Sequence, residues 1–275
     1  MTAAVRLDAV QFAYPDGGLA LRGVDLSIEP GERVAVVGQN GSGKSTLARH
    51  LDGLLRPTAG RVLIEGADIR GRPTADVARQ VGLLFQDPDL QLFEERIRSE
   101  VQFGPWNLGL RGAALEAAVD GALEAVGLQD VAEANPFLLG RSRRKLVALA
   151  AVLALGSPIV VLDEPTTGQD ARGVARIQAI VAGLAAEGRT VVAVSHDLRL
   201  VAESFERVVV LQAGTIVLDG PPVDVFGPGA ATTLRATRLE PPPAARAGAA
   251  FGLGSTPTDA AFVAALAALA ARRGR

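Results

Sequence analysis

A glycine-rich segment between an apolar strand and a helix carries the strongest chemical signal in this sequence. Its residues are Gly38-Gln39-Asn40-Gly41-Ser42-Gly43-Lys44-Ser45-Thr46, and we call this segment the phosphate loop. Glycines let the backbone curl so that successive N–H groups point at one phosphate chain, and the following helix N-terminus adds its positive end. In such a pattern Lys44 reaches the β- and γ-phosphates and Ser45 ligates Mg²⁺. The segment predicts a binding site for a nucleoside triphosphate.

Two adjacent carboxylates follow a second apolar strand. The run IVVL, residues 159–162, ends in Asp163 and Glu164. A phosphate loop needs an acid on a neighbouring strand to hold Mg²⁺ through water, and Asp163 fits that need. Glu164 would face the γ-phosphate and could polarise the attacking water. Alone, such a pair is more often a helix cap or a surface turn, but beside a phosphate loop it indicates a metal and water site.

Four further residues could belong to the same site. Tyr14 could stack on a purine base, or it could simply pack before a proline turn. Gln86 could contact Mg²⁺ or the attacking water, although a glutamine after a strand is commonly a turn residue. His196 could hydrogen-bond the γ-phosphate through a neutral imidazole. Asp170 is a candidate for contact across a subunit interface, whereas His50, inside the helix after the phosphate loop, is predicted to be structural.

The elements that must position these residues alternate between strands and helices. Short β-branched runs recur with helical patterns between several of them: VRLDAVQF, RVAVVG, RVLIEG, VGLLF, IVVLD, TVVAVS and RVVVLQ. This alternation predicts an α/β fold with a largely parallel sheet covered by helices. One hairpin is expected before Gly66, and VVVLQAGTIVLDG predicts a second hairpin that closes the globular part.

Composition divides the chain into a globular part and a tail. Residues 1–225 hold all the motifs above, and residues 87–155 within them are predominantly helical in pattern. Residues 226–275 are predicted to form a Pro- and Ala-rich linker and a C-terminal helix that begins near a cap at Thr258. That helix carries one apolar stripe, which could pack on its own domain or dock on a partner: Phe262, Leu266 and Leu269.

Bulk composition excludes several kinds of chemistry. The 275 residues, 48% of them hydrophobic, are enough for a substantial core. Because 28 Lys and Arg oppose 30 Asp and Glu, the net charge of −2 gives no general attraction to nucleic acid. The absence of cysteine excludes disulfides and cysteine nucleophiles. Residues 1–12 lack a signal-like apolar core, and residues 156–158 interrupt the longest uncharged run, so we expect no membrane span.

The ordered set of motifs resembles the ATP-binding cassette (ABC) ATPases over about residues 5–225. The motifs that match in order and spacing are Tyr14, the phosphate loop, Gln86, Asp163-Glu164, Asp170 and His196. Within that family, residues 85–110 resemble the energy-coupling-factor importer ATPases, whose pattern there is FQ-x-PD-x-Q followed by an acid, Val, FGP and NLGL. The matching residues are Gln86, Pro88, Asp89, Gln91, Glu100, Val101, Phe103, Gly104, Pro105, Asn107, Leu108, Gly109 and Leu110.

The resemblance implies both a fold and a function. The fold would be the P-loop NTPase fold of ABC ATPases, with a RecA-like core, an antiparallel β-subdomain, a helical subdomain and a C-terminal extension. The chain would bind ATP and Mg²⁺ and hydrolyse ATP beside a second ABC ATPase subunit. Both subunits would lie peripherally at the cytoplasmic face of the cell membrane, under an integral membrane scaffold. A substrate-binding membrane subunit would capture a vitamin or a transition-metal ion, and no nucleic acid is implied.

The resemblance also assigns residues to roles. Tyr14 and the phosphate loop would bind the nucleotide, while Glu164, His196 and Gln86 would act in catalysis. Ser45, Gln86 and Asp163 would hold the metal, and Asp89 and Gln91 would lie near the groove that receives a coupling helix. Two other functions are also compatible with the motifs, a soluble ABC ATPase and a non-hydrolysing nucleotide-dependent regulatory subunit. The transported solute cannot be predicted, because no residue of this subunit is expected to touch it.

One family motif is altered in this chain. ABC ATPases carry a signature of the form Leu-Ser-Gly-Gly-Gln at the start of a helix, which presses on the γ-phosphate held by the opposite subunit. Here that position holds Leu139-Gly140-Arg141-Ser142-Arg143, in which only Leu139 is retained. Three interpretations compete: bulk at Arg141 makes that composite site slow or inactive, Arg141 and Ser142 contact the phosphate themselves, or the segment is a solvated basic turn. Because the chain's own phosphate loop and acids are complete, we expect a heterodimer.

Overall fold

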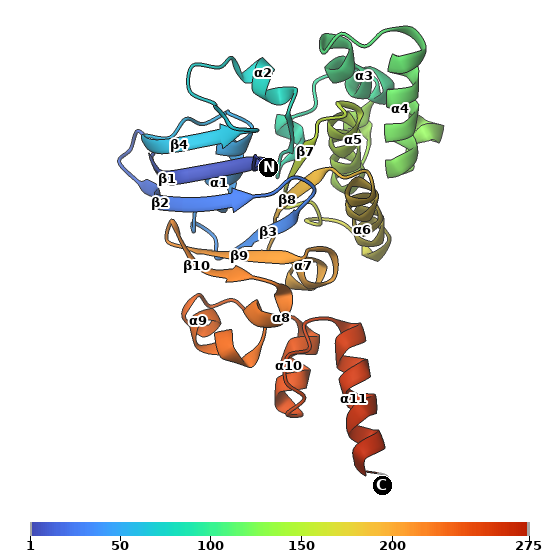
Figure 1. The fold of residues 1–275 in the computed structure, drawn as a ribbon. Helices are drawn as coiled ribbons and strands as arrows, with labels where there is room; N and C mark the ends of the chain where they lie inside the picture. The colour runs from blue at the N-terminus through green and yellow to red at the C-terminus, as the bar shows by residue number, and fades with distance from the viewer. Residues whose placement is uncertain (1, 274–275) are drawn as a thin grey trace.

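Two β-sheets and the helices packed on them form the fold in the computed structural model, which describes residues 2–273 (Figure 1). The larger sheet has six strands in the order β10-β9-β3-β8-β7-β6. Its strands are β3 (Arg33–Val37), β6 (Val81–Leu84), β7 (Ile159–Asp163), β8 (Thr190–Val194), β9 (Arg207–Gln212) and β10 (Thr215–Gly220). All neighbouring pairs are parallel except β9 and β10, which form the predicted closing hairpin. The predicted, largely parallel α/β sheet is confirmed.

The smaller sheet is antiparallel and lies beside the larger one (Figure 1). Its order is β2-β1-β4-β5, built from β1 (Val5–Ala13), β2 (Leu19–Ile28), β4 (Ala59–Ile64) and β5 (Ala67–Asp68). The pair β1 and β2 is the hairpin expected in the N-terminal region. Buried and exposed residues alternate along the later part of β2, as they do in a sheet that covers a core with one face.

Helix α1 (Lys44–Leu51) lies between the two sheets and fills the first hydrophobic core. Val34 and Val36 point to this side of β3, whereas Ala35 and Val37 point to the second core on the other face. That second core contains residues from α3 (Ile97–Asn107), α4 (Gly112–Val126), α5 (Arg141–Ala154), α6 (Ala171–Ala186) and α7 (Leu198–Ser204). Both faces of the large sheet are therefore covered, which explains why its central strands are apolar throughout.

The stretch with helical pattern, residues 87–155, folds as α3, α4 and α5, which pack on one another. Short 3₁₀ turns connect these helices at Pro88–Leu90 (η1), Gln129–Val131 (η2) and Pro136–Leu138 (η3). In Figure 1 this green group of helices stands to one side of the sheets. The short α2 (Thr74–Ala78) precedes β6 at the edge of the large sheet.

Residues 226–275, predicted as a Pro- and Ala-rich linker and a C-terminal helix, contain several short helices before the last one. Helix α8 (Pro222–Val225) precedes this segment, which contains η4 (Pro228–Ala230), α9 (Ala231–Ala236), α10 (Pro243–Ala250) and α11 (Asp259–Arg273). Prolines stand at the starts of α8 and α10, where a fixed φ favours the helix. Thr258 caps α11 as predicted, since its Oγ1 accepts a hydrogen bond from the Ala261 amide at 3.1 Å. Within the described part of the chain, no helix has the length and apolarity that a bilayer crossing requires.

Candidate functional site

The phosphate loop joins β3 to α1, and its backbone geometry requires glycine. Gly43, which stands directly before α1, has φ of 104°, and a Cβ there would lie 2.6 Å from the carbonyl oxygen of Ala20. A Cβ on Gly38 would lie 2.2 Å from the carbonyl oxygen of Leu211. Any other residue at either position would clash with main-chain atoms, so these two glycines permit the tight curl that the sequence predicted.

The Lys44 ammonium lies inside this curl. Its Nζ donates hydrogen bonds to the carbonyl oxygens of Gly38 at 2.8 Å and Gln39 at 2.9 Å. Burial lowers the pKa of Lys44, while the carboxylates of Glu164 and Asp163 act in the opposite direction. Lys44 therefore contributes a partly desolvated cationic donor, and such a donor suits a polyanionic ligand.

The two acids reach the loop from the end of β7. Since β3, β6, β7 and β8 are all in the parallel part of the sheet, their carboxyl ends meet at one edge, where ligands bind in open α/β sheets. The hydroxyl of Ser45 donates to Asp163 Oδ1 at 3.2 Å. A cavity of about 320 Å³ brings together residues far apart in the sequence, and it is lined by Asn40, Gly41, Gly43, Lys44, Ser45, Thr46, Gln86 and Glu164.

Glu164 is held in an unusual backbone conformation. Its φ of 52° lies in the left-handed region, which non-glycine residues rarely adopt. The carboxylate is buried, and its Oε2 lies 2.6 Å from Nδ1 of His196. The His196 ring is 65% exposed, so it faces solvent on one side and Glu164 on the other. The structure therefore pairs two of the three predicted catalytic residues, Glu164 and His196, with each other.

The oxygen donors at this edge fit Mg²⁺. Ser45 and Asp163 present a hydroxyl and a carboxylate within hydrogen-bond distance of each other, and Gln86 lines the same cavity as Ser45. Among residues 2–273 no group of three or more His, Cys, Asp or Glu could hold a metal by itself. Mg²⁺ is commonly bound by one or two protein oxygens together with substrate phosphates, so the sparse donor set suits that ion. Burial raises the pKa of Asp163, and the hydrogen bond from Ser45 opposes the rise.

Three other residues that the sequence singled out are Tyr14, Asp170 and His50. The Tyr14 hydroxyl is 3.0 Å from Thr46 Oγ1, and the ring packs edge-on against Phe12 with centroids 4.9 Å apart. Tyr14 therefore touches the end of the phosphate loop, while its stacking on a base stays a prediction. Asp170 caps α6 by accepting from the Gly173 amide at 2.8 Å, and its interface role also stays a prediction. His50 is fully buried in the first core, in agreement with a structural role.

The altered signature segment begins α5 and contacts acids of its own chain. Arg141 pairs with Asp87 at 3.5 Å, and Arg144 pairs with Asp89 at 3.1 Å. The Ser142 hydroxyl donates to Oε1 of Gln169 at 2.9 Å, just before Asp170. The basic turn is thus partly neutralised within the chain, which none of the three interpretations from the sequence included.

Lys145 is the residue that the sequence analysis missed. Its side chain is buried and donates to the carbonyl oxygens of Gln86, at 2.9 Å, and Glu164. Burial lowers its pKa to about 8. One signal in the sequence could have revealed it, because Lys44 and Lys145 are the only lysines in the chain.

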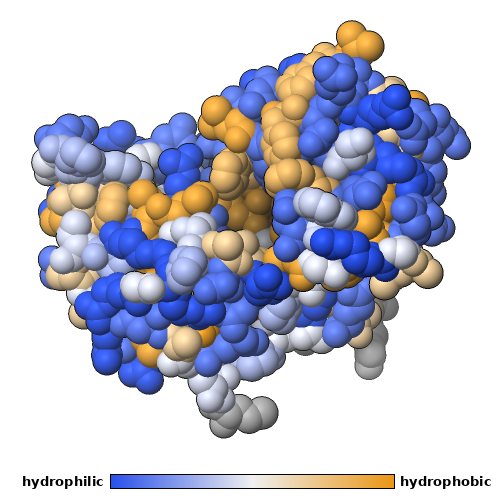
Figure 2. Space-filling view, turned by 90° about the horizontal axis from the view of Figure 1, so that it is seen from above, coloured by the Kyte–Doolittle hydropathy of each residue, from blue (hydrophilic) through white to orange (hydrophobic). Residues whose placement is uncertain are grey.

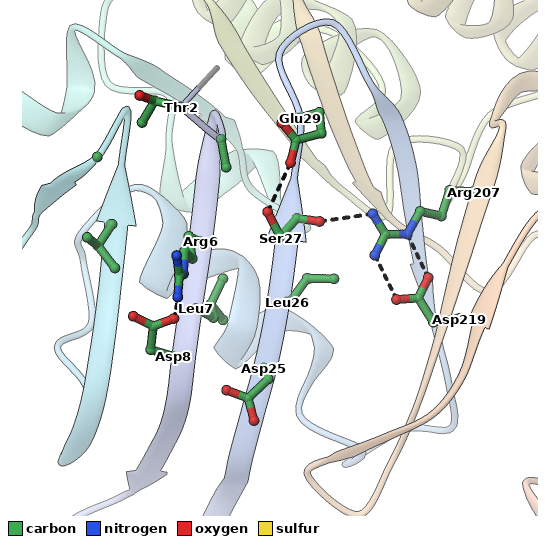
Figure 3. Close-up of a pocket in the computed structure, with 13 residues that line it drawn as sticks. Thr2, Arg6, Leu7, Asp8, Asp25, Leu26, Ser27, Glu29, Arg207 and Asp219 are labelled. Atoms are coloured by element: carbon green, nitrogen blue, oxygen red, sulfur yellow. Dashed lines mark hydrogen bonds and ion pairs between the residues drawn. The ribbon is translucent and has the colours of Figure 1, made fainter.

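A larger hollow of about 640 Å³ lies elsewhere, between the small sheet and the β9–β10 hairpin (Figure 3). Figure 3 shows the Arg207 guanidinium against the Asp219 carboxylate, with an Nε to Oδ1 distance of 2.6 Å, and Arg6 against Asp8 at 2.7 Å. The hollow shares no residue with the phosphate loop. Since these charges already have partners, the smaller cavity at the phosphate loop is the better candidate site.

Comparisons with known proteins agree with this geometry. The family described as "ABC transporter" matches residues 21–167. The energy-coupling factor transporter ATP-binding protein EcfA of Methanothermobacter thermautotrophicus is 43% identical over 224 residues, which cover 81% of this chain and 72% of that protein. EcfA of Methanocaldococcus jannaschii is 41% identical over 217 residues, 78% of each chain.

Two solved structures extend the likeness to three dimensions. The first is cbiO1 from Clostridium perfringens, described as part of the ABC transporter complex cbiONQ. It superposes with a TM-score of 0.74 at 31% identity and covers 90% of this chain and 98% of its own. The second is a dimeric ATP-binding cassette in a post-hydrolysis state with ADP and Pi, with a TM-score of 0.73 at 27% identity over 79% of this chain and 98% of its own.

Proposed function

This chain belongs to the ABC transporter family of ATPases, as an ATP-binding subunit of the energy-coupling-factor type, and from that premise we propose that it energises uptake of a micronutrient. The solute is a vitamin or a transition-metal ion. The chain works at the cytoplasmic face of the membrane in a dimer with a second ABC ATPase subunit. An integral membrane scaffold and a substrate-binding membrane subunit complete the assembly. Support comes from relatives that are named for such transporters.

One observation carries the proposal for ATP hydrolysis. Six residues of the phosphate loop line one cavity together with Gln86 and Glu164, and one of the six, Ser45, donates a hydrogen bond to Asp163. When nucleotide binds, the loop amides and Lys44 would donate hydrogen bonds to the triphosphate. Lys44 would then leave the carbonyl oxygens of Gly38 and Gln39 and bind phosphate oxygens instead. Tyr14, which already contacts Thr46, would stack on the adenine.

Residues at the strand ends would perform the hydrolytic step. Glu164 would polarise the attacking water, and His196, whose Nδ1 lies 2.6 Å from the Glu164 carboxylate, would orient that carboxylate and donate to the γ-phosphate. Gln86, which follows β6 and lines the cavity, would contact the water or the metal. Ser45, Asp163 and Gln86 would hold Mg²⁺, which supplies charge neutralisation at the phosphates when bound.

The altered signature supports a heterodimer. In ABC ATPases this segment serves the nucleotide of the opposite subunit, and here it carries Arg141 and Arg143 where the family has Gly and Gln. Arg141 pairs with Asp87 and Ser142 with Gln169, so both groups are engaged within the chain. We infer that the partner's site is the weaker one, while this chain's own phosphate loop and acids need an intact signature from the partner.

Turnover should therefore depend on pairing. The isolated chain is expected to hydrolyse ATP about 10²-fold more slowly than the assembled complex, because donors from the partner's signature are missing from the γ-phosphate. Phosphate release, measured for the purified chain and for the complex at equal site concentration, checks this. Equal turnover per site in the two preparations would rule out a need for the partner's signature.

An exposed aromatic patch offers a surface for the membrane scaffold. Leu90, Phe93, Phe103 and Trp106 are all large, apolar and exposed, and the Phe93 and Phe103 rings pack edge-on with centroids 4.7 Å apart. The patch lies on η1, α3 and the loop between them, close to Asp89. Figure 2 shows apolar atoms gathered around a hollow on the face seen from above. Large apolar side chains exposed in this way mark an interaction site, and a coupling helix of the scaffold is the proposed occupant.

Substituting the exposed aromatic patch should prevent the chain from binding the membrane scaffold. Replacing Phe103 and Trp106 together by Ser is expected to abolish recovery of the membrane scaffold with the tagged chain, because rings of this kind act as interface anchors. A matched control is Phe251→Ser, which removes an exposed ring from the C-terminal segment. Quantitative mass spectrometry of the recovered complexes makes the comparison. Equal scaffold recovery with the double variant would exclude this docking surface.

The experiment that tests the proposed function is recovery of the complex through an affinity tag on this chain. Membranes of the native cells, solubilised in mild detergent, should give a second ABC ATPase subunit and a multi-spanning membrane protein in fixed stoichiometry. Recovery of the chain only with ribosomes or nucleic acid, or without a membrane protein, would contradict the assignment.

A further inference from the structure

The chain's two lysines flank the acid pair from opposite sides. Every other strongly basic side chain is arginine, yet Lys44 and Lys145 are both buried and both donate to main-chain carbonyls. Lys44 belongs to the phosphate loop, and Lys145 belongs to α5, on the far side of β7. The carboxylates of Asp163 and Glu164 interact electrostatically with both ammonium groups. The function of Lys44 follows from the phosphate loop, but that of Lys145 does not.

The contacts of Lys145 converge on two residues of the site. Its Nζ donates to the carbonyl oxygen of Gln86 at 2.9 Å and to that of Glu164. Glu164 is the residue with φ of 52°, a conformation that persists only where the surroundings determine it. On its amide side, Glu164 donates to the carbonyl of Val194 at 2.8 Å. Lys145 thus fixes the carbonyl group of the strained residue Glu164, and through the same ammonium group it links Glu164 to the carbonyl group of Gln86.

We propose that Lys145 is a positioning residue for ATP hydrolysis, which fixes the main chain of Glu164 and Gln86 so that their side chains stay aimed into the nucleotide cavity. The inference rests on the proposed function, because it needs Glu164 to act on the attacking water. Lys145 does not line the cavity itself. It therefore acts through the two residues that it holds.

A lysine is better suited to hold these two carbonyl groups than an arginine or an apolar residue would be. An ammonium is a compact group with three donors, so it can satisfy two carbonyls that converge on one point, whereas a guanidinium is a wide planar fork. An apolar side chain would fill the core equally well, and it would avoid the cost of burying a charge. The presence of a buried lysine among apolar residues of α5 therefore indicates that its donors are needed.

The position of Lys145 on α5 also links the two sites of a dimer. The first turn of this helix holds Arg141 and Ser142, the segment that faces the partner's nucleotide in the proposed assembly. One turn later, Lys145 donates hydrogen bonds to the main-chain carbonyls of Glu164 and Gln86 in the site of its own chain. A shift of α5 as the dimer closes on the partner's nucleotide would move the main chain that carries this chain's own water-activating carboxylate.

The test compares kinetic constants of the purified complex for Lys145→Met and Lys145→Gln. Met has a similar shape but no donors, and it should lower kcat by at least about 10-fold through misplacement of Glu164. The KM for ATP should stay within about twofold, since the phosphate loop is intact. Gln keeps N–H donors, so it should restore most of the lost kcat, and it provides the readout if the Met variant does not assemble.

Arg189→Met is the matched control. Arg189 is a largely buried cation that donates to a main-chain carbonyl, that of Ser157 at 2.8 Å, away from the nucleotide cavity. Its loss should affect stability but not kcat. A normal kcat for Lys145→Met, or an equal loss for Met and Gln, would overturn the inference for Lys145 alone. Full activity of Glu164→Gln in the same assay would instead overturn the proposed function, so the two failures are distinguishable.

Discussion

Glu164→Gln is expected to lower kcat of the complex by about 10²–10⁴-fold, because an amide cannot accept the proton of the attacking water. The substitution keeps the size of the side chain, and a neutral amide can still hydrogen-bond the imidazole of His196, which lies 2.6 Å from the carboxylate. ATP binding should survive, since the phosphate loop is unchanged. Phosphate release gives the turnover, and retention of labelled ATP on the complex gives the binding.

The comparison needs a carboxylate that lies outside the site. Glu187→Gln removes an exposed carboxylate near the end of α6 and should leave kcat unchanged. If Glu164→Gln kept more than about a tenth of the wild-type kcat, the loss would be too small for a general base, and another group would have to activate the water.

Lys44→Ala is expected to abolish the stabilisation of the purified chain by Mg-ATP. A ligand at 100 times its Kd stabilises the folded state by about 2.7 kcal/mol, and that increment disappears when the ligand no longer binds. The alanine variant should still fold, because the carbonyls of Gly38 and Gln39 that it leaves without Lys44 belong to a loop beside a cavity into which water can enter. Thermal unfolding with and without saturating Mg-ATP measures the effect as a shift in Tm.

Arg6→Ala provides the corresponding cation control. Arg6 pairs with Asp8 on the small sheet, and both lie outside the phosphate-loop cavity. Its removal should leave the Mg-ATP shift at the wild-type size. An equal shift for Lys44→Ala and the wild type would show that the triphosphate does not use this lysine.

The phosphate loop could be predicted because its chemistry is local. The glycines, Lys44 and Ser45 are consecutive in the sequence, and the apolar run before them is long enough to predict the strand that delivers them. Asp163 and Glu164 could be predicted because they stand at the end of an apolar strand. The carboxyl ends of parallel strands meet at one edge of the sheet, which brings these acids to the phosphate loop. The α/β class followed from the same alternation of strands and helices.

Residues whose contacts are long-range could not be predicted in the same way. Lys145 meets Gln86 across 59 positions and Glu164 across 19, and no local pattern specifies which carbonyl a buried ammonium will reach. The altered signature was open to three interpretations because the pairing of Arg141 with Asp87 depends on how α5 packs against η1.

Long-range contacts also determine the backbone structure of the C-terminal segment. Its prolines and alanines predicted a linker, since neither provides a strong amphipathic pattern. In the fold, Leu234, Ala244 and Ala245 are buried, and this tertiary contact stabilises short helices that propensity alone would leave marginal.

The central claim is that ATP is held by the phosphate loop with its γ-phosphate beside Glu164. An experimental structure of the Glu164→Gln complex with Mg-ATP tests it most directly. The claim predicts a triphosphate within the cavity lined by Asn40, Gly41, Gly43, Lys44 and Ser45, with Lys44 Nζ moved from the Gly38 and Gln39 carbonyls onto phosphate oxygens. A nucleotide bound elsewhere on the chain, or Lys44 still on both carbonyls with ATP present, would contradict it.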